Sequence, residues 1–192
     1  KEEGTTAARL LERRGGDGGY MVISLVDNIK GVSRRIENLQ MRKVWEVDRE
    51  EVTAFHVHPK DIGAAIVSFD EMRPSDEWLW AGPGWRDRKS IHVWEITAVD
   101  VQADDPEAIA TKWAAAFGGN FQLEGDVLRM PLDDGEIRFV EAEDGRGDGV
   151  AAVEFSVTDR SAILTAAENH QLSWSGNEVT ICGTRFRFRD LG

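Results

Sequence analysis

The sequence has little of several features that would narrow its function at once. Its 192 residues include a single cysteine, Cys182, so no disulfide can form within the chain, and we expect a reducing, cytoplasmic compartment. Ile181 and Gly183 flank this cysteine, which favours a buried core thiol over a reactive one. We find no run of about 18 apolar residues and no basic start leading into a short apolar core, so neither a membrane span nor a signal peptide is indicated.

Positive charge is also scarce. The chain carries 23 Lys and Arg against 35 Asp and Glu, a net charge of −12, which repels phosphate backbones and anionic membranes. The densest basic stretch, Arg185, Arg187 and Arg189, alternates with Phe186 and Phe188. That alternation is typical of a strand with one charged face. We therefore expect no nucleic-acid partner and no membrane partner.

An internal repeat organises the rest of the chain. Three times, a strand ends in an acidic helix cap, a helix follows, and antiparallel strands come after the helix. The caps at Asp105 and Asp159 lie 54 residues apart, which is one module length. The first cap is at Asp27 and Asn28. By this pattern the third copy is about one strand short.

The repeat predicts a division of the chain. Residues 1–71 contain the tail of a preceding module, with a short helix over 1–14, and then one βαβββ module. Residues 72–90 form a tryptophan-rich linker or long ordered loop. Residues 91–145 and 149–192 form two modules that pair with each other. The helix over 1–14 can be capped by Thr5 or Thr6 and is closed by Gly15 and Gly16.

Three stretches carry a resemblance to a known family. They are residues 5–29 (TTAARLLERRGGDGGYMVISLVDNI), 55–69 (FHVHPKDIGAAIVSF) and 96–118 (ITAVDVQADDPEAIATKWAAAFG). They resemble the vicinal-oxygen-chelate superfamily, which includes glyoxalases, bleomycin-resistance proteins and extradiol dioxygenases. The nearest local match is to methylmalonyl-CoA epimerase and glyoxalase-like proteins. The resemblance implies an α+β fold of repeated βαβββ modules, whose curved mixed or antiparallel sheets cup a ligand.

The resemblance also implies that modules work in pairs. With the second and third repeats paired, the first repeat needs a partner from elsewhere. We expect either an upstream module or another subunit of a homodimer.

The family's metal site takes a first-strand ligand, usually His, and a last-strand ligand, usually Glu, from each module. Matched onto this sequence, those positions fall at Met21 and Ser68 in the first repeat, near Ala98 and Phe139 in the second, and near Ala152 in the third. None is a strong ligand for a hard divalent ion. We therefore expect no metal and no cofactor.

The remaining polar candidates for catalysis are weak. His56 and His58 share a strand face and could form an acid/base pair, but partly solvated structural histidines are the favoured alternative. Glu154 lies in the apolar context AAVEFSV. It could be a general base in the ligand cup, or a charge on the solvent face of a one-sided sheet.

The sequence therefore favours a glyoxalase-like protein that binds a small organic molecule without the usual metal site. The function would be sequestration, or an unidentified lyase or isomerase activity, and Trp78, Trp80 and Trp94 are the candidate substrate-binding residues. The alternative is a metal-dependent epimerase, glyoxalase or dioxygenase whose ligands lie in an upstream module. Whether the chain is an enzyme stays open.

Overall fold

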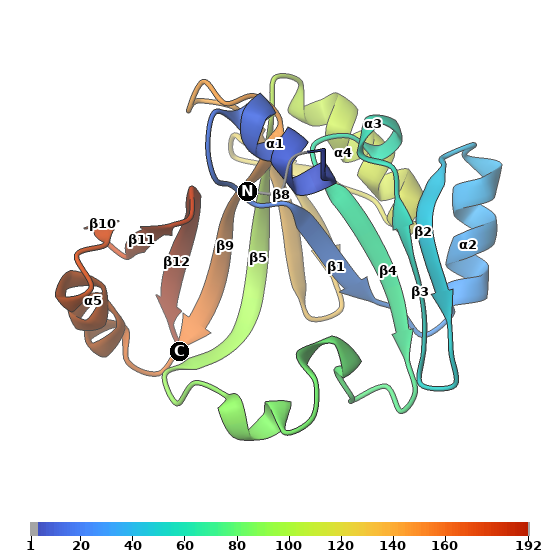
Figure 1. Ribbon diagram of the computed structural model, residues 1–192. Helices are drawn as coiled ribbons and strands as arrows, with labels where there is room; N and C mark the ends of the chain where they lie inside the picture. Colours follow the sequence, from blue (N-terminus) through green and yellow to red (C-terminus); the bar gives the residue numbers. More distant parts are fainter. Residues whose placement is uncertain (1–3, 192) are drawn as a thin grey trace.

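A computed structural model describes residues 4–191 (Figure 1). The first helix, α1 (Thr6–Arg14), begins where the Thr5 side chain accepts a hydrogen bond from the backbone N–H of Ala8 at 3.1 Å. It ends at Gly15, whose φ of 65° is the left-handed conformation that glycine adopts without a steric penalty. The part of the predicted helix over 1–3 lies outside the described residues.

The first repeat forms a four-stranded sheet with one βαβββ unit. Its elements are β1 (Met21–Leu25), α2 (Ile29–Asn38), β2 (Lys43–Asp48), β3 (Val52–Val57), the short helix α3 (Pro59–Ile62) and β4 (Ile66–Met72). The strand order is β1-β4-β3-β2, with β1 parallel to β4 and the other pairs antiparallel. Strand β1 pairs only with β4 in this sheet and forms one of its two edges.

Residues 73–92 connect the two sheets. This segment carries two short 3-10 turns, η1 (Leu79–Ala81) and η2 (Trp85–Arg88), and forms the lowest part of the molecule in Figure 1.

The second and third repeats form one eight-stranded sheet. Their elements are β5 (Val93–Ala103), α4 (Pro106–Phe117), β6 (Gln122–Glu124), β7 (Val127–Leu132), β8 (Gly135–Glu141), β9 (Gly149–Val157), α5 (Arg160–Asn169), β10 (Ser173–Ser175), β11 (Glu178–Ile181) and β12 (Thr184–Asp190). The strand order is β10-β11-β12-β9-β5-β8-β7-β6. The first strands of the two modules, β5 and β9, pair antiparallel at the centre of the sheet.

These elements confirm the predicted fold class of repeated βαβββ modules. Two details were predicted wrongly. The third repeat is complete, because β10, a three-residue strand without an apolar run, pairs with β11. Cys182 is exposed, because it lies in the tight β11–β12 turn with a φ of 48° and its side chain is not enclosed.

One core joins the two sheets. Trp113 of α4 is fully buried between them, with its ring centroid 5.8 Å from Phe139 of β8, and its indole N–H donates to the Gly63 carbonyl at 3.3 Å. Phe117 of the same helix reaches Phe69 of β4 at 4.9 Å. Helix α4 therefore packs against the helix-bearing face of both sheets.

Gly63 is required where this contact forms. Its φ is 92°, and a Cβ at this position would lie 2.4 Å from Cδ1 of Ile109 on α4.

Within residues 4–191, no helix has both the length and the apolar character needed to cross a membrane.

Candidate functional site

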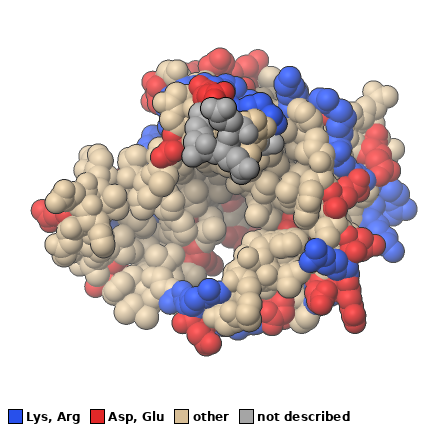
Figure 2. All heavy atoms as spheres, viewed as in Figure 1, with Lys and Arg blue, Asp and Glu red and all other residues tan. Residues whose placement is uncertain are grey.

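Each sheet has one face turned away from the helices, which we call its open face. In the four-stranded sheet, Phe55, Val57, Val67 and Phe69 point into the helix-bound core, so the alternate residues of β3 and β4 lie on the open face. In the eight-stranded sheet, Val101 and Phe139 point into the core in the same way. Figure 2 shows a hollow in the surface where Figure 1 places β5 on one side and β1 on the other, with acidic atoms visible on its wall.

The positions predicted for family metal ligands lie on these open faces with one exception. Ser68 is buried on the four-stranded sheet, and Ala98 and Ala152 are buried on the eight-stranded sheet. Phe139 is the exception, because it packs against Trp113 on the helix side. Its neighbour Arg138 faces the open side instead.

A buried carboxyl group is the centre of the open face on the four-stranded sheet. Asp70 of β4 is only 1% exposed. Its Oδ1 accepts a hydrogen bond from Ser68 Oγ at 2.5 Å, and its Oδ2 accepts one from the indole N–H of Trp80 at 2.6 Å. Because Trp80 belongs to η1, the connecting segment folds back over this sheet and covers Asp70.

His56 and Trp45 complete this cluster. His56 lies directly across from Ser68 in the β3–β4 ladder, and its ring packs against Trp45 of β2 with centroids 4.4 Å apart and the planes tilted by 31°. Trp45 also meets Trp80 edge to face at 6.2 Å. Burial lowers the pKa of the His56 imidazole, against the opposing attraction of the Asp70 carboxylate. The imidazole is therefore mainly neutral near pH 7 and can accept or donate a hydrogen bond.

Two other residues proposed for the site from the sequence, Trp78 and His58, lie apart from Asp70. Trp78 packs on Val52, Ala54 and Met72 at the end of the same sheet. The Nδ1 atom of His58 accepts a hydrogen bond from the backbone N–H of Lys60 at 3.0 Å, so His58 caps α3. His56 and His58 are thus not a pair: one faces the open side and the other begins a helix.

Ion pairs fill the open face of the eight-stranded sheet. Arg138 of β8 lies at their centre and donates to both carboxylate oxygens of Glu154 on β9, at 2.9 and 3.1 Å. It also donates to Glu136 at 2.5 Å and lies 3.8 Å from Asp100. These contacts join the second and third modules across the β5–β9 seam.

The network extends to both sides of this centre. Arg187 of β12 contacts Asp100 at 2.7 Å and Glu178 of β11 at 3.0 Å. On the opposite side, Arg129 of β7 donates to Glu136 at 2.5 Å. The Asp100 side chain is only 4% exposed, so this carboxylate has been removed from water and is compensated by two guanidinium groups.

Glu154, the predicted general base, is part of this network. Burial alone would raise the pKa of its carboxyl group, but hydrogen bonds from Arg138 and Thr97 outweigh that effect and lower the pKa. A carboxylate that is held charged by an arginine is a weak proton acceptor. Trp94 lies at a bulge of β5 and is 70% exposed, and no aromatic partner is found for it among residues 4–191.

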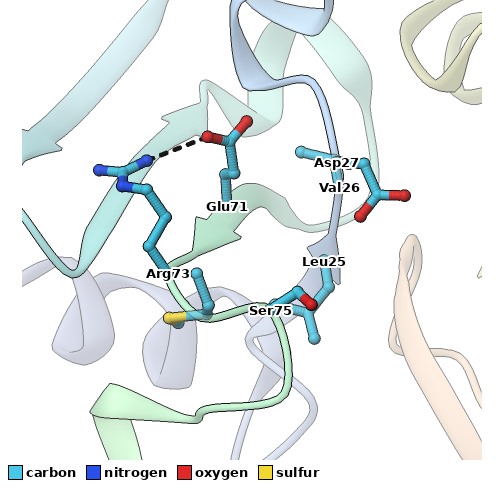
Figure 3. Close-up of a pocket in the computed structure, with 7 residues that line it drawn as sticks. Leu25, Val26, Asp27, Glu71, Arg73 and Ser75 are labelled. Atoms are coloured by element: carbon cyan, nitrogen blue, oxygen red, sulfur yellow. Dashed lines mark hydrogen bonds and ion pairs between the residues drawn. The ribbon is translucent and has the colours of Figure 1, made fainter.

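A pocket of about 230 Å³ opens where β1 and β4 end (Figure 3). The Arg73 and Glu71 side chains point toward each other on one side of it, 3.0 Å apart, and Leu25 and Ser75 lie on the other side. Glu71 also accepts a hydrogen bond from the backbone N–H of Ile29 at 2.9 Å. Glu71 thus links Arg73 to the start of α2.

The residues present do not fit the metal site that the resemblance implies. In the part of the chain that the structure describes, no three His, Cys, Asp or Glu side chains lie together in a way that could hold a metal ion. His56 and Asp70 offer two donors at most. Asp100 and Glu154 are bound to arginines.

Comparison with known proteins gives matches to solved structures alone. No protein-family profile and no curated protein sequence matches the chain. Among solved structures, 4-hydroxymandelate synthase from Streptomyces coelicolor, in a variant form, is similar over 90% of this chain and 58% of its own, with 15% identity and a TM-score of 0.63. A Mn(II)-bound glyoxalase from Novosphingobium aromaticivorans matches over 88% and 62%, with 9% identity and a TM-score of 0.57.

A third similar structure is a hypothetical protein from Staphylococcus aureus, which matches over 88% of this chain and 64% of its own, with 15% identity and a TM-score of 0.60. The chain thus spans less than two thirds of the length of each of these proteins.

Proposed function

Since the chain has the fold of the vicinal-oxygen-chelate proteins, such as glyoxalases and dioxygenases, we propose that it binds a small organic molecule without a metal ion. The binding site is the open face of the four-stranded sheet, around Asp70, His56, Trp45 and Trp80. The outcome is sequestration of the molecule, or lyase or isomerase chemistry on it.

One observation carries this proposal. Asp70 is a carboxyl group buried on an otherwise open sheet face, and an exposed residue of a connecting segment, Trp80, supplies one of its two hydrogen bonds. Trp45 and Trp80 are 41% and 39% exposed, so aromatic surface surrounds a few polar groups. That combination is typical of small-molecule sites.

The open face of the eight-stranded sheet is a weaker candidate for binding. Its carboxylates are paired with its arginines, so a ligand would have to break strong ion pairs to reach them.

A thermal-shift screen with a library of small organic molecules tests the proposal, because a ligand that binds the folded state raises the melting temperature. Hits should stabilise the wild-type protein and lose their effect in the Trp45→Leu variant. Trp174→Leu, which removes a similarly exposed tryptophan on β10, serves as the control. Hits that Trp45→Leu leaves unchanged would place the site elsewhere.

The second candidate is a metal-dependent enzyme, favoured by the likeness to a glyoxalase that holds Mn(II). In that case ligands from outside residues 4–191 would complete a site with His56 and Asp70. Metal analysis of the purified full-length protein distinguishes the two candidates, since stoichiometric Zn, Ni, Mn or Fe supports the enzyme.

Two further expectations stay predictions. A cytoplasmic location rests on the single cysteine. A homodimer is supported by the free edge of β1, which pairs with no second strand within residues 4–191 and on which Ile23 and Leu25 are 43% and 51% exposed. Size-exclusion chromatography with light scattering tests the dimer.

A further inference from the structure

The charge around Asp70 is unbalanced. Both hydrogen bonds to this buried carboxyl group come from neutral donors, the Ser68 hydroxyl and the Trp80 indole. Within residues 4–191, no lysine or arginine forms an ion pair with it. This contrasts with Asp100, the comparably buried carboxylate of the other sheet, which has two arginines. A buried carboxylate without a cation is costly, so the site favours a positively charged partner.

His56 does not provide that positive charge at neutral pH. Asp70 attracts the charged form of His56, but burial lowers the pKa of the imidazole and keeps it mainly neutral. Its ring instead lies against Trp45 and extends the aromatic surface beside the carboxyl group.

The aromatic groups are suited to a cation as well. The rings of Trp45 and Trp80 meet at an angle of 65°, and each leaves about 40% of its surface exposed. Indole faces attract cations more strongly than other aromatic side chains do. The net charge of −12 adds a general attraction for cationic molecules.

The cover over Asp70 can be exchanged. Trp80 lies in a three-residue 3-10 turn whose residues are not buried, so its displacement exposes the carboxyl group without opening the core. An ammonium N–H can take the place of the indole N–H at Oδ2 of Asp70, which replaces a neutral hydrogen bond with a stronger charge-assisted one.

We propose that the open face of the four-stranded sheet binds a small organic cation, whose ammonium group contacts Asp70 and whose body lies against Trp45 and Trp80. This inference rests on the proposed function and names the chemical class of its ligand.

The test uses four probes of similar size: benzylammonium and phenylethylammonium as cations, benzyl alcohol as the neutral match and benzoate as the anionic match. Binding is followed by calorimetry and tryptophan fluorescence on the full chain. Both cations should bind, at least 10-fold more tightly than the alcohol or the anion. Asp70→Asn should weaken cation binding at least 10-fold, while Trp174→Leu leaves it unchanged.

Because Asp70→Asn alters a buried group and can impair folding, Trp45→Leu is measured in parallel. Trp45 is on the surface, so this variant keeps the fold, and it should weaken cation binding several-fold. Benzyl alcohol or benzoate binding as tightly as the cations would overturn the cation inference and leave small-molecule binding at this site intact. Cations that fail to bind at millimolar concentration also overturn it, whereas the library screen described above decides the proposed function separately.

Discussion

Arg138 and Glu154 form a two-point ion pair across the seam between the second and third modules, with nitrogen–oxygen distances of 2.9 and 3.1 Å. Both side chains are 14% exposed. Arg138 belongs to β8 of one module and Glu154 to β9 of the next. A face that could hold a ligand is thus used to join two modules.

This ion pair makes stability depend on pH. The carboxyl pKa of Glu154 is lowered below its ordinary value of 4.5 in the folded state, so its contribution to stability is full above that value. The contribution is lost as the pH falls through the lowered pKa. We expect Glu154→Gln to be less stable than the wild type at pH 6 and the difference to shrink toward pH 3. Urea unfolding at several pH values measures this.

The matched control is Glu141→Gln, which changes an exposed carboxyl group that has no arginine partner among residues 4–191. Its free energy of unfolding should follow the wild-type curve. A Glu154→Gln curve parallel to the wild type at all pH values would contradict the role given to the ion pair.

The hydrogen bond from Trp80 to Asp70 should stabilise the connecting segment. Trp80→Phe keeps an aromatic ring but removes the donor, which leaves a buried carboxylate oxygen unpaired at a cost of about 1–3 kcal/mol. Trp85→Phe removes a similar indole donor, but its acceptor Glu77 is accessible to water, so the loss should be smaller. Denaturant unfolding of both variants measures the two losses in the free energy of unfolding. Equal losses for Trp80→Phe and Trp85→Phe would contradict the role given to the Trp80–Asp70 hydrogen bond.

Helix α4 should make the two sheets unfold together. Trp113→Ala removes the largest side chain of the shared core and should cost about 3–5 kcal/mol. Circular dichroism and fluorescence should report one coincident transition, both in the wild type and in this variant. Two separate transitions in the wild type would show that the sheets are independent. Trp174→Ala, at the exposed edge strand β10, should change stability by less than about 1 kcal/mol.

Cys182 should react in the folded protein. Its position in the exposed β11–β12 turn leaves the thiol open to a reagent such as dithionitrobenzoate. One equivalent should be modified without denaturant. If the thiol of Cys182 reacted only after unfolding, Cys182 would be buried, as the flanking Ile181 and Gly183 indicated from the sequence.

The sequence predicts the modules well because their signals are local. The helix caps Asn28, Asp105 and Asp159 each accept a hydrogen bond from a backbone N–H three residues on, as their spacing indicates. The alternation of Arg185, Arg187 and Arg189 likewise predicts a strand with one charged face, which is β12. Short strands such as β10 lack an apolar pattern and were missed.

The candidate site was only partly predictable, because its parts are distant in the sequence. His56 and Trp80 were singled out, but Trp45 and Asp70 have no local signal. Trp45 and Asp70 reach His56 through the β2–β3–β4 pairing, and the return of the connecting segment brings Trp80 to Asp70. Phe139 was assigned to the ligand-facing side, but an error of one residue places a side chain on the opposite face of a strand. Only the register of the sheet shows which face of the strand a given side chain occupies.

Nuclear magnetic resonance of the tryptophan indole N–H groups tests the proposed site most directly. The chain has seven tryptophans, and the Trp80 signal should be distinct because its N–H is bound to a carboxylate. Small molecules identified in the thermal-shift screen should move the signals of Trp80 and Trp45 and leave those of Trp113 and Trp174 in place. Signals of Trp80 and Trp45 that stay fixed while a bound molecule moves those of Trp94 or Trp174 would contradict the site.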